Sequence, residues 1–189
     1  MKKLFLIFLL SVSITAFAQE PVRNQVGDTE KAMLLKQMEK QRKSFSCHFI
    51  EEKSIAVLDE TVVSKGIITY EASNQLTCEY TEPESLVLSK DMKGNLTVTK
   101  NGNPIKASMM HKQMMDMMET FVSGKAVGMT KEYEVEVWSS DNEYIVSLIP
   151  KTASRFSVIE LYLNKDNKSI AKTVLKETKG DSTTITMSE

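Results

Sequence analysis

The chain is poor in the side chains from which most catalytic and metal-binding sites are built. Its 189 residues include only two histidines and two cysteines. Cys47 directly precedes His48, but adjacent residues on a strand point to opposite faces, so the two cannot bind one metal ion. His111 lies in a methionine-rich segment without a second ligand at metal-site spacing. The sequence also lacks a G-x-S-x-G elbow, a phosphate-binding glycine loop and an HExxH motif. We therefore expect a protein that is not an enzyme and that holds no metal and no cofactor.

An excess of charge of either sign is also lacking. The chain has 24 basic and 25 acidic side chains, a balance that gives no indication of nucleic-acid binding. Glu132, Glu134 and Glu136 alternate with apolar residues and would be a weak site for a hard cation at best. They are better interpreted as the solvated face of a strand.

A long apolar run is missing except at the start of the chain. Lys2 and Lys3 precede a short apolar stretch over residues 4–10, and a small-x-small motif ends at Ala18. This layout is typical of a secretory signal peptide, and the stretch is shorter than the roughly 20 residues that a membrane-spanning helix needs. We expect cleavage after Ala18 and a periplasmic location.

The rest of the chain is predicted to form one domain. Residues 19–27 are polar and are expected to be a flexible leader. Residues 28–189 contain no internal repeat, and their length suits a single domain. The first element of this domain is predicted to be a helix from Asp28 or Thr29 to about Lys43.

Methionine is concentrated in one later segment. Six of the twelve methionines lie between Met109 and Met118. Ser108 can cap a helix here and Gly124 can end it. The apolar side of this helix is predicted to consist of Met110, Met114, Met117, Met118 and Phe121, with Met115 and Val122 at its margin. Such a side usually packs on a core, but flexible methionines also suit a surface that accepts apolar guests of varying shape.

Most other segments alternate with a period of two, which is typical of strands. Asn101-Gly102 is the strongest hairpin signal, and a polar loop is expected before residue 62. The predicted strands cover residues 45–52, 62–71, 75–82, 84–89, 96–99, 133–137, 144–150, 156–163, 170–177 and 183–187. We expect an α+β fold, a strongly curved antiparallel sheet (an incomplete β-barrel) with a lid of helices over a hydrophobic cavity; a closed barrel is the alternative.

The two cysteines lie on predicted strands with one further strand between them. In a simple meander Cys47 and Cys78 are about 9.6 Å apart, which is beyond bonding reach. Both fall on the apolar side of their strands. Two buried thiols are therefore expected, with a disulfide or a redox pair as the alternative.

Several motifs in a fixed order resemble a known family. They are S-F-S-C-H-F at 44–49, G-I-I-T-Y at 66–70, L-T-C-E-Y-T-E-P at 76–83, Y-I-V-S-L-I-P-K at 144–151 and V-L-K-E-T-K-G-D-S-T-T-I-T-M at 174–187. Over residues 28–187 the chain is similar to the periplasmic outer-membrane lipoprotein carriers, the LolA-like family. The resemblance implies an unclosed barrel that binds the acyl chains of lipoproteins. An inner-membrane transporter would be the donor and an outer-membrane protein the acceptor.

The resemblance and the alternation together indicate a ligand-binding hydrophobic cavity. The predicted lining residues are Phe45, Cys47, Phe49, Ile68, Tyr70, Leu76, Tyr80, Leu86 and Leu88 from the sheet and Met110, Met114, Met117, Met118 and Phe121 from the helix. The expected function is a monomeric carrier, or chaperone, of lipoprotein acyl chains or other lipids. The alternatives are a non-carrier module that senses a lipid or protein of the cell envelope, a structural envelope protein and, last, a hydrolase.

The chain departs from the family at positions that control the lid. Ala72 and Ser73 stand where the well-known carriers have Arg-Pro, and Cys78 replaces a tryptophan that is common there. The lid control and the one-way transfer of those carriers are therefore not carried over to this chain.

Overall fold

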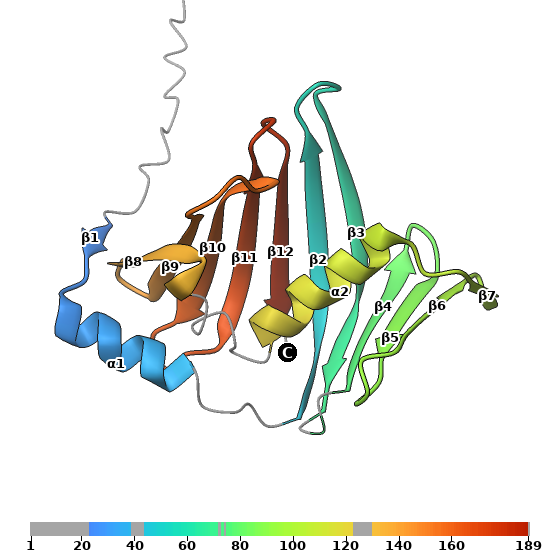
Figure 1. The fold of residues 1–189 in the computed structure, drawn as a ribbon, viewed down its shortest axis with the longest axis horizontal. Helices are drawn as coiled ribbons and strands as arrows, with labels where there is room; N and C mark the ends of the chain where they lie inside the picture. Colours follow the sequence, from blue (N-terminus) through green and yellow to red (C-terminus); the bar gives the residue numbers. More distant parts are fainter. Residues whose placement is uncertain (1–22, 39–43, 72, 74, 123–129, 189) are drawn as a thin grey trace, which may run out of the picture.

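The structure is a computed structural model that describes residues 23–38, 44–71, 73, 75–122 and 130–188 (Figure 1). The signal peptide and Gly124 fall outside the described residues. The described elements are β1 (Asn24–Gln25), α1 (Asp28–Met38), β2 (Phe45–Ile55), β3 (Glu60–Tyr70), β4 (Leu76–Glu82), β5 (Leu86–Lys90), β6 (Leu96–Lys100), β7 (Asn103–Ile105), α2 (Met109–Val122), β8 (Tyr133–Ser139), β9 (Glu143–Pro150), β10 (Phe156–Asn164), β11 (Ile170–Glu177) and β12 (Ser182–Ser188).

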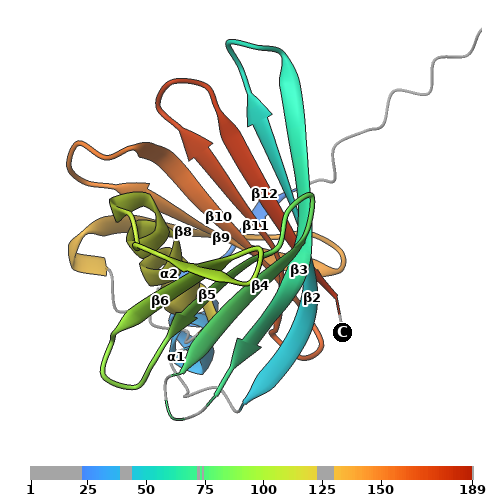
Figure 2. The same ribbon diagram turned by 90° about the vertical axis from the view of Figure 1, so that its right-hand side faces the viewer.

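All twelve strands belong to one sheet. Their order is β1-β8-β9-β10-β11-β12-β2-β3-β4-β5-β6-β7, and neighbouring strands run antiparallel. The predicted antiparallel sheet with two helices is confirmed. The closed barrel is wrong because β1 and β7 remain as edges, and the sheet is not as strongly curled as we expected. Both helices lie on the same face of the sheet, as the two perpendicular views show (Figures 1 and 2).

The two shortest strands were missed by the sequence analysis. β7 follows the predicted Asn101-Gly102 turn, in which both residues have positive φ angles of 50° and 77°. β1 lies in the segment predicted to be a flexible leader and pairs with Trp138 and Ser139 of β8. Strands of two or three residues are too short to show a period, so only the turn signal pointed to β7.

The start of the described chain is also held to the sheet by side chains. The Arg23 guanidinium lies 3.4 Å from the Glu160 carboxylate and donates to the Tyr162 hydroxyl at 3.3 Å. Glu160 is buried and also pairs with Lys176 at 3.3 Å. The leader therefore contacts β10 as well as β8.

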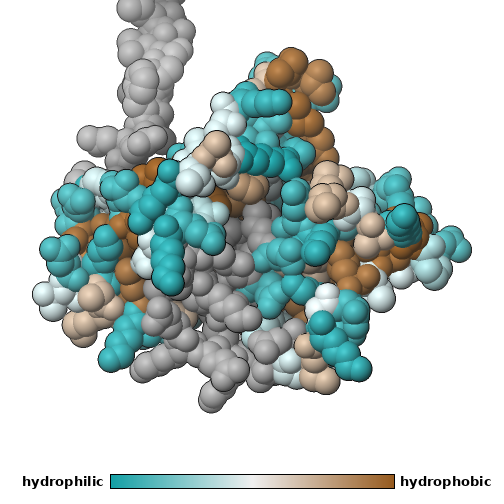
Figure 3. All heavy atoms as spheres, viewed as in Figure 1, coloured by the Kyte–Doolittle hydropathy of each residue, from teal (hydrophilic) through white to brown (hydrophobic). Residues whose placement is uncertain are grey.

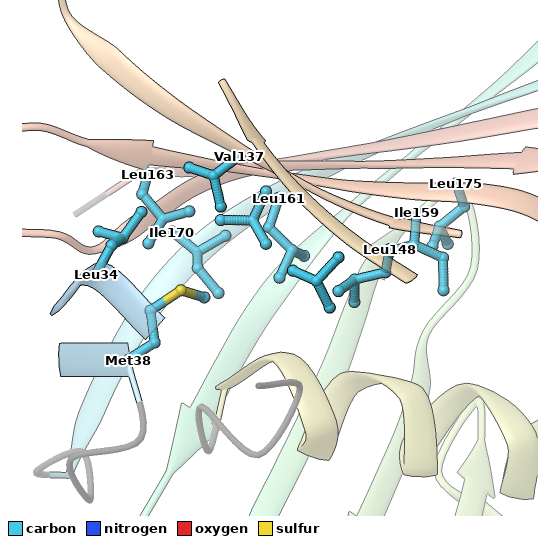
Figure 4. Packing of buried hydrophobic residues seen from close by; sticks show 11 residues of the cluster. Leu34, Met38, Val137, Leu148, Ile159, Leu161, Leu163, Ile170 and Leu175 are labelled. Carbon is cyan, nitrogen blue, oxygen red and sulfur yellow. The ribbon is translucent and has the colours of Figure 1, made fainter. Parts of the chain in front are cut away.

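The face that the helices cover, here called the inner face, carries two apolar clusters. The cluster against α1 consists of Leu34, Met38, Val135, Val137, Val146, Leu148, Ile159, Leu161, Leu163, Ile170 and Leu175. In the close-up its labelled strand side chains project toward the helices, and Leu34 and Met38 of α1 approach Leu163 and Ile170 (Figure 4). The cluster against α2 consists of Phe49, Ile68, Tyr70, Leu76, Cys78, Tyr80, Leu88, Val98, Met115, Met118 and Ile185.

Gly66 leaves room for an aromatic contact in the cluster against α2. It stands opposite Phe49 on β2 and Tyr80 on β4. The rings of Phe49 and Tyr80 meet edge to face over this position, with centroids 5.0 Å apart. A Cβ on Gly66 would lie 2.1 Å from the backbone oxygen of Glu79 and 2.6 Å from a ring carbon of Phe49. Only glycine fits here.

Gly66→Ala is expected to lower the free energy of unfolding by about 1–3 kcal/mol or more, because the added methyl overpacks against backbone and a buried ring. Urea unfolding followed by circular dichroism measures this loss. Gly27→Ala is the matched control, since a Cβ at Gly27 meets nothing within 4 Å. Equal stability of the two variants would contradict the packing described here.

Candidate apolar binding site under helix α2

The methionine-rich helix forms where the sequence predicts it. The Ser108 hydroxyl accepts a hydrogen bond from the His111 backbone N–H at 3.2 Å. In return, Nδ1 of His111 accepts from the Ser108 backbone N–H at 3.3 Å. This reciprocal cap satisfies two groups at the helix start, as a capping box does. His111 therefore has a structural role at the helix terminus.

The helix is rotated relative to the expected orientation. Met115, predicted at the margin, is fully buried, and so is Met118. Met114 is half-buried and packs against the same cluster. Met110, predicted on the apolar side, is 62% exposed, so its assignment to the cavity lining is wrong for this structure. The side chains of Met117 and Phe121 lie outside the part that the structure describes.

The structure brings the predicted sheet residues together beneath α2. Phe49, Ile68, Tyr70, Leu76, Tyr80 and Leu88 are buried in one cluster, and Phe45, Cys47 and Leu86 pack against it half-buried. The sequence analysis missed Val98, Ile185 and Met187 in this cluster and the whole cluster against α1. The alternation of β6, β8, β10 and β12 carried the signal for most of these residues, but no local pattern says which distant strands share a face.

The two cysteines lie as the meander predicts. Cys47 on β2 and Cys78 on β4 both stand opposite Ile68 of the intervening strand β3. Neither forms a disulfide. Burial, with the nearby Glu51 and Cys47 adding to it, raises the pKa of the Cys78 thiol to about 12. Cys78 is therefore an unreactive thiol that acts as a small apolar side chain.

Polar contacts join the helix to the sheet at two places. Lys90 of β5 donates to Asp116 at 2.7 Å and to Glu119 at 2.6 Å. The Tyr80 hydroxyl lies 3.3 Å from the sulfur of Met114. Partly exposed ion pairs contribute little to stability, typically below about 1 kcal/mol each. The helix is therefore held mainly by methionine contacts, with ion pairs that fix its position.

One carboxylate lies on the inner face beside these apolar residues. Glu51 of β2 lies two residues after Phe49 and therefore points to the same face of the sheet. The Tyr80 hydroxyl donates a hydrogen bond to the Glu51 carboxylate at 2.9 Å. Burial raises the pKa of Glu51 above its ordinary value of 4.5, although the Tyr80 hydrogen bond and Lys53 act against the rise. Burial and the Glu51 charge also raise the pKa of Tyr80. The alternation of β2 puts Glu51 on the same side as Phe45, Cys47 and Phe49, but Glu51 was not among the predicted site residues.

Replacing this carboxylate should change how stability depends on pH. Because the folded state raises the pKa of Glu51, it binds the proton more tightly than the unfolded state does. The free energy of unfolding therefore falls as pH rises from about 4.5 through the raised pKa. Glu51→Gln removes this loss, so the variant should gain stability over wild type at pH 7.5 and gain little at pH 4.

Urea unfolding at both pH values measures the two differences. Glu52→Gln is the matched control, because Glu52 is exposed and points to the opposite face. A gain for Glu51→Gln that is the same at both pH values would contradict the desolvation of Glu51.

The described residues contain no group of three or more His, Cys, Asp or Glu side chains that could hold a metal ion. None of the described helices is long and apolar enough to cross a membrane.

A second apolar feature lies away from the helices. The hairpin between β2 and β3 projects beyond its neighbours, and its tip is apolar in the space-filling view (Figures 1 and 3). Val57 is 89% exposed and Leu58 is 59% exposed, with the partly exposed Val62 and Val63 below them. The expectation of a polar loop here was wrong, and the run from Ile55 to Leu58 was the signal that we overlooked.

Comparison with known proteins gives structural matches only. No family model matches the chain, and no curated protein matches it in sequence. A solved structure of MucB matches with a TM-score of 0.50 and 16% identity, over 85% of this chain and 58% of MucB. The MucA/MucB complex of Pseudomonas aeruginosa matches with a TM-score of 0.49 and 12% identity, over 83% of this chain and 53% of that one.

A LolA superfamily protein from Nitrosomonas europaea matches with a TM-score of 0.41 and 12% identity, over 84% of this chain and 91% of that protein. The structural matches thus include a protein of the superfamily that the sequence resembles. Identities this low show the fold alone, and the chain spans little more than half of MucB.

Proposed function

We propose that the chain is an exported carrier that binds the acyl chains of lipoproteins, or of related lipids, between helix α2 and the inner face of the sheet. The supporting observation is the way in which α2 covers this face. Its buried contacts are methionines, Met115 and Met118, on a bed of aromatic and aliphatic side chains. The polar contacts that hold the helix are few and can be exchanged for water at small cost.

Methionine suits this role because of its flexibility. Its unbranched side chain can move aside and repack around a guest without a single required geometry. An acyl chain that replaces these contacts gains about 0.8 kcal/mol for each methylene it buries. A chain of ordinary length therefore offsets the cost of lifting the helix.

The start of the sequence supports an envelope location. A basic start, a short apolar stretch and a small-x-small motif ending at Ala18 are typical of export to the periplasm. In that compartment a carrier would receive its cargo from an inner-membrane transporter and deliver it to an outer-membrane acceptor as a monomer.

Met114→Asp is expected to weaken binding of the apolar fluorophore diphenylhexatriene at least tenfold. Met114 faces the cluster without being fully buried, so the new carboxylate would enter the site beside Tyr80 and Glu51 while the sheet stays folded. An unpaired charge in an apolar site is strongly disfavoured. Fluorescence titration measures the affinity, and far-UV circular dichroism checks the sheet.

Met110→Asp is the matched control, because it makes the same change on the exposed side of the same helix. It should leave binding unchanged. Retained binding by a folded Met114→Asp variant, or equal loss in both variants, would show that the ligand does not lie under α2.

The alternative function is a binding module for an envelope protein. MucB, whose fold this chain shares, has been solved with a protein partner, MucA. An exposed apolar group of Ile105, Met109 and Met110 beside the edge strand β7 favours this alternative. A carrier should pass a bound fluorescent lipid to acceptor vesicles within minutes, whereas a sensing module should retain it.

A further inference from the structure

One hydroxyl on the inner face has no hydrogen-bond partner. Thr173 of β11 is fully buried, and its Oγ1 is the one buried side-chain polar atom without a partner in the described part of the chain. It stands opposite Leu161 on β10 and Ile185 on β12, both buried in the two clusters. An unpaired buried hydroxyl carries a desolvation penalty, and valine would fill the same volume without it. The unpaired Thr173 hydroxyl therefore lowers the stability of the protein when no ligand is bound.

A second polar group lies in the same row of the sheet. Ile185 is opposite Glu51 on its other side, so Thr173, Ile185 and Glu51 follow one another across β11, β12 and β2. The spacing of strands puts Thr173 and Glu51 about 9.6 Å apart along this row. The Tyr80 hydroxyl occupies one oxygen of Glu51. A carboxylate has acceptor capacity left after one such bond.

The row lies where the two apolar clusters meet. Leu161 belongs to the cluster against α1, and Ile185 belongs to the cluster against α2. Thr173 and Glu51 are thus a polar pair at the boundary of two apolar areas. A ligand with a long apolar part and one polar linkage matches this arrangement.

We propose that Thr173 and Glu51 bind the polar end of the ligand and select a neutral acyl amide or ester over a free fatty acid. This inference rests on the proposed function. The Thr173 hydroxyl donates to the carbonyl oxygen of the amide or ester and so gains the partner that it lacks. The Glu51 carboxylate accepts from a donor beyond the linkage and repels the carboxylate of a fatty acid. The apolar chain extends from there under α2.

The test compares ligands that differ only at the polar end. Diphenylhexatriene, which has no polar atom, serves as the reporter, and N-methylpalmitamide and palmitic acid compete with it. Thr173→Val should weaken the amide about two- to tenfold, as expected for one lost hydrogen bond, without weakening the reporter. It should also raise the urea midpoint of the empty protein. Thr173→Ser, which keeps the hydroxyl, should retain the affinity for the amide.

Glu51→Gln is the second variant, and it should strengthen the binding of palmitic acid relative to the amide. If Thr173→Val binds the reporter and the amide as wild type does, the inference is overturned while the proposed function stands. If wild-type protein prefers palmitic acid to the amide, the inference is overturned in the same way. If wild-type protein does not bind the reporter at all, the proposed function fails and the inference fails with it.

Discussion

The burial of one entire face of an open sheet is the constraint on which the rest of the structure depends. Twelve strands in a row leave two faces and two edges, and apart from a few polar residues such as Glu51 and Thr173 the inner face is apolar from β8 to β6. Two short helices must cover it, because an exposed apolar area of that size would drive aggregation. Helix α1 covers one cluster with Leu34 and Met38, and α2 covers the other with Met115 and Met118.

The two covers differ in how they are joined to the sheet. Helix α1 follows directly after β1, which is paired in the sheet, and Tyr144 donates to Glu30 of this helix at 2.7 Å. Helix α2 lies between β7 and β8, which are far apart in the sheet order. It is held by methionines, the Lys90 ion pairs and the contact between Tyr80 and Met114. In the proposed carrier α2 is the cover that a guest displaces, and Glu51 and Thr173 lie at the inner border of the area that it covers.

Local patterns in the sequence predicted the elements well and their assembly less well. The alternation of Phe45, Cys47 and Phe49 marked both a strand and its buried side, and Ser108 marked the start of α2. The pairing of β12 with β2 could not be read from any local pattern, because it joins segments more than a hundred residues apart. The rotation of α2 was ambiguous because methionines surround much of the helix, so periodicity could not decide between Met110 and Met115. Thr173 gave no signal at all, since threonine is common in strands and only its lack of a partner is unusual.

The native mass spectrum of the protein, exported with its own N-terminal segment and isolated gently from the cell envelope, tests the central claim most directly. We predict a bound species of added mass that releases a fatty acyl chain on fragmentation and that carries this chain in amide or ester linkage. A folded protein that shows only its own mass, and that takes up no acyl ligand when one is added, would contradict it. The methionines of α2 would then be a core and nothing more.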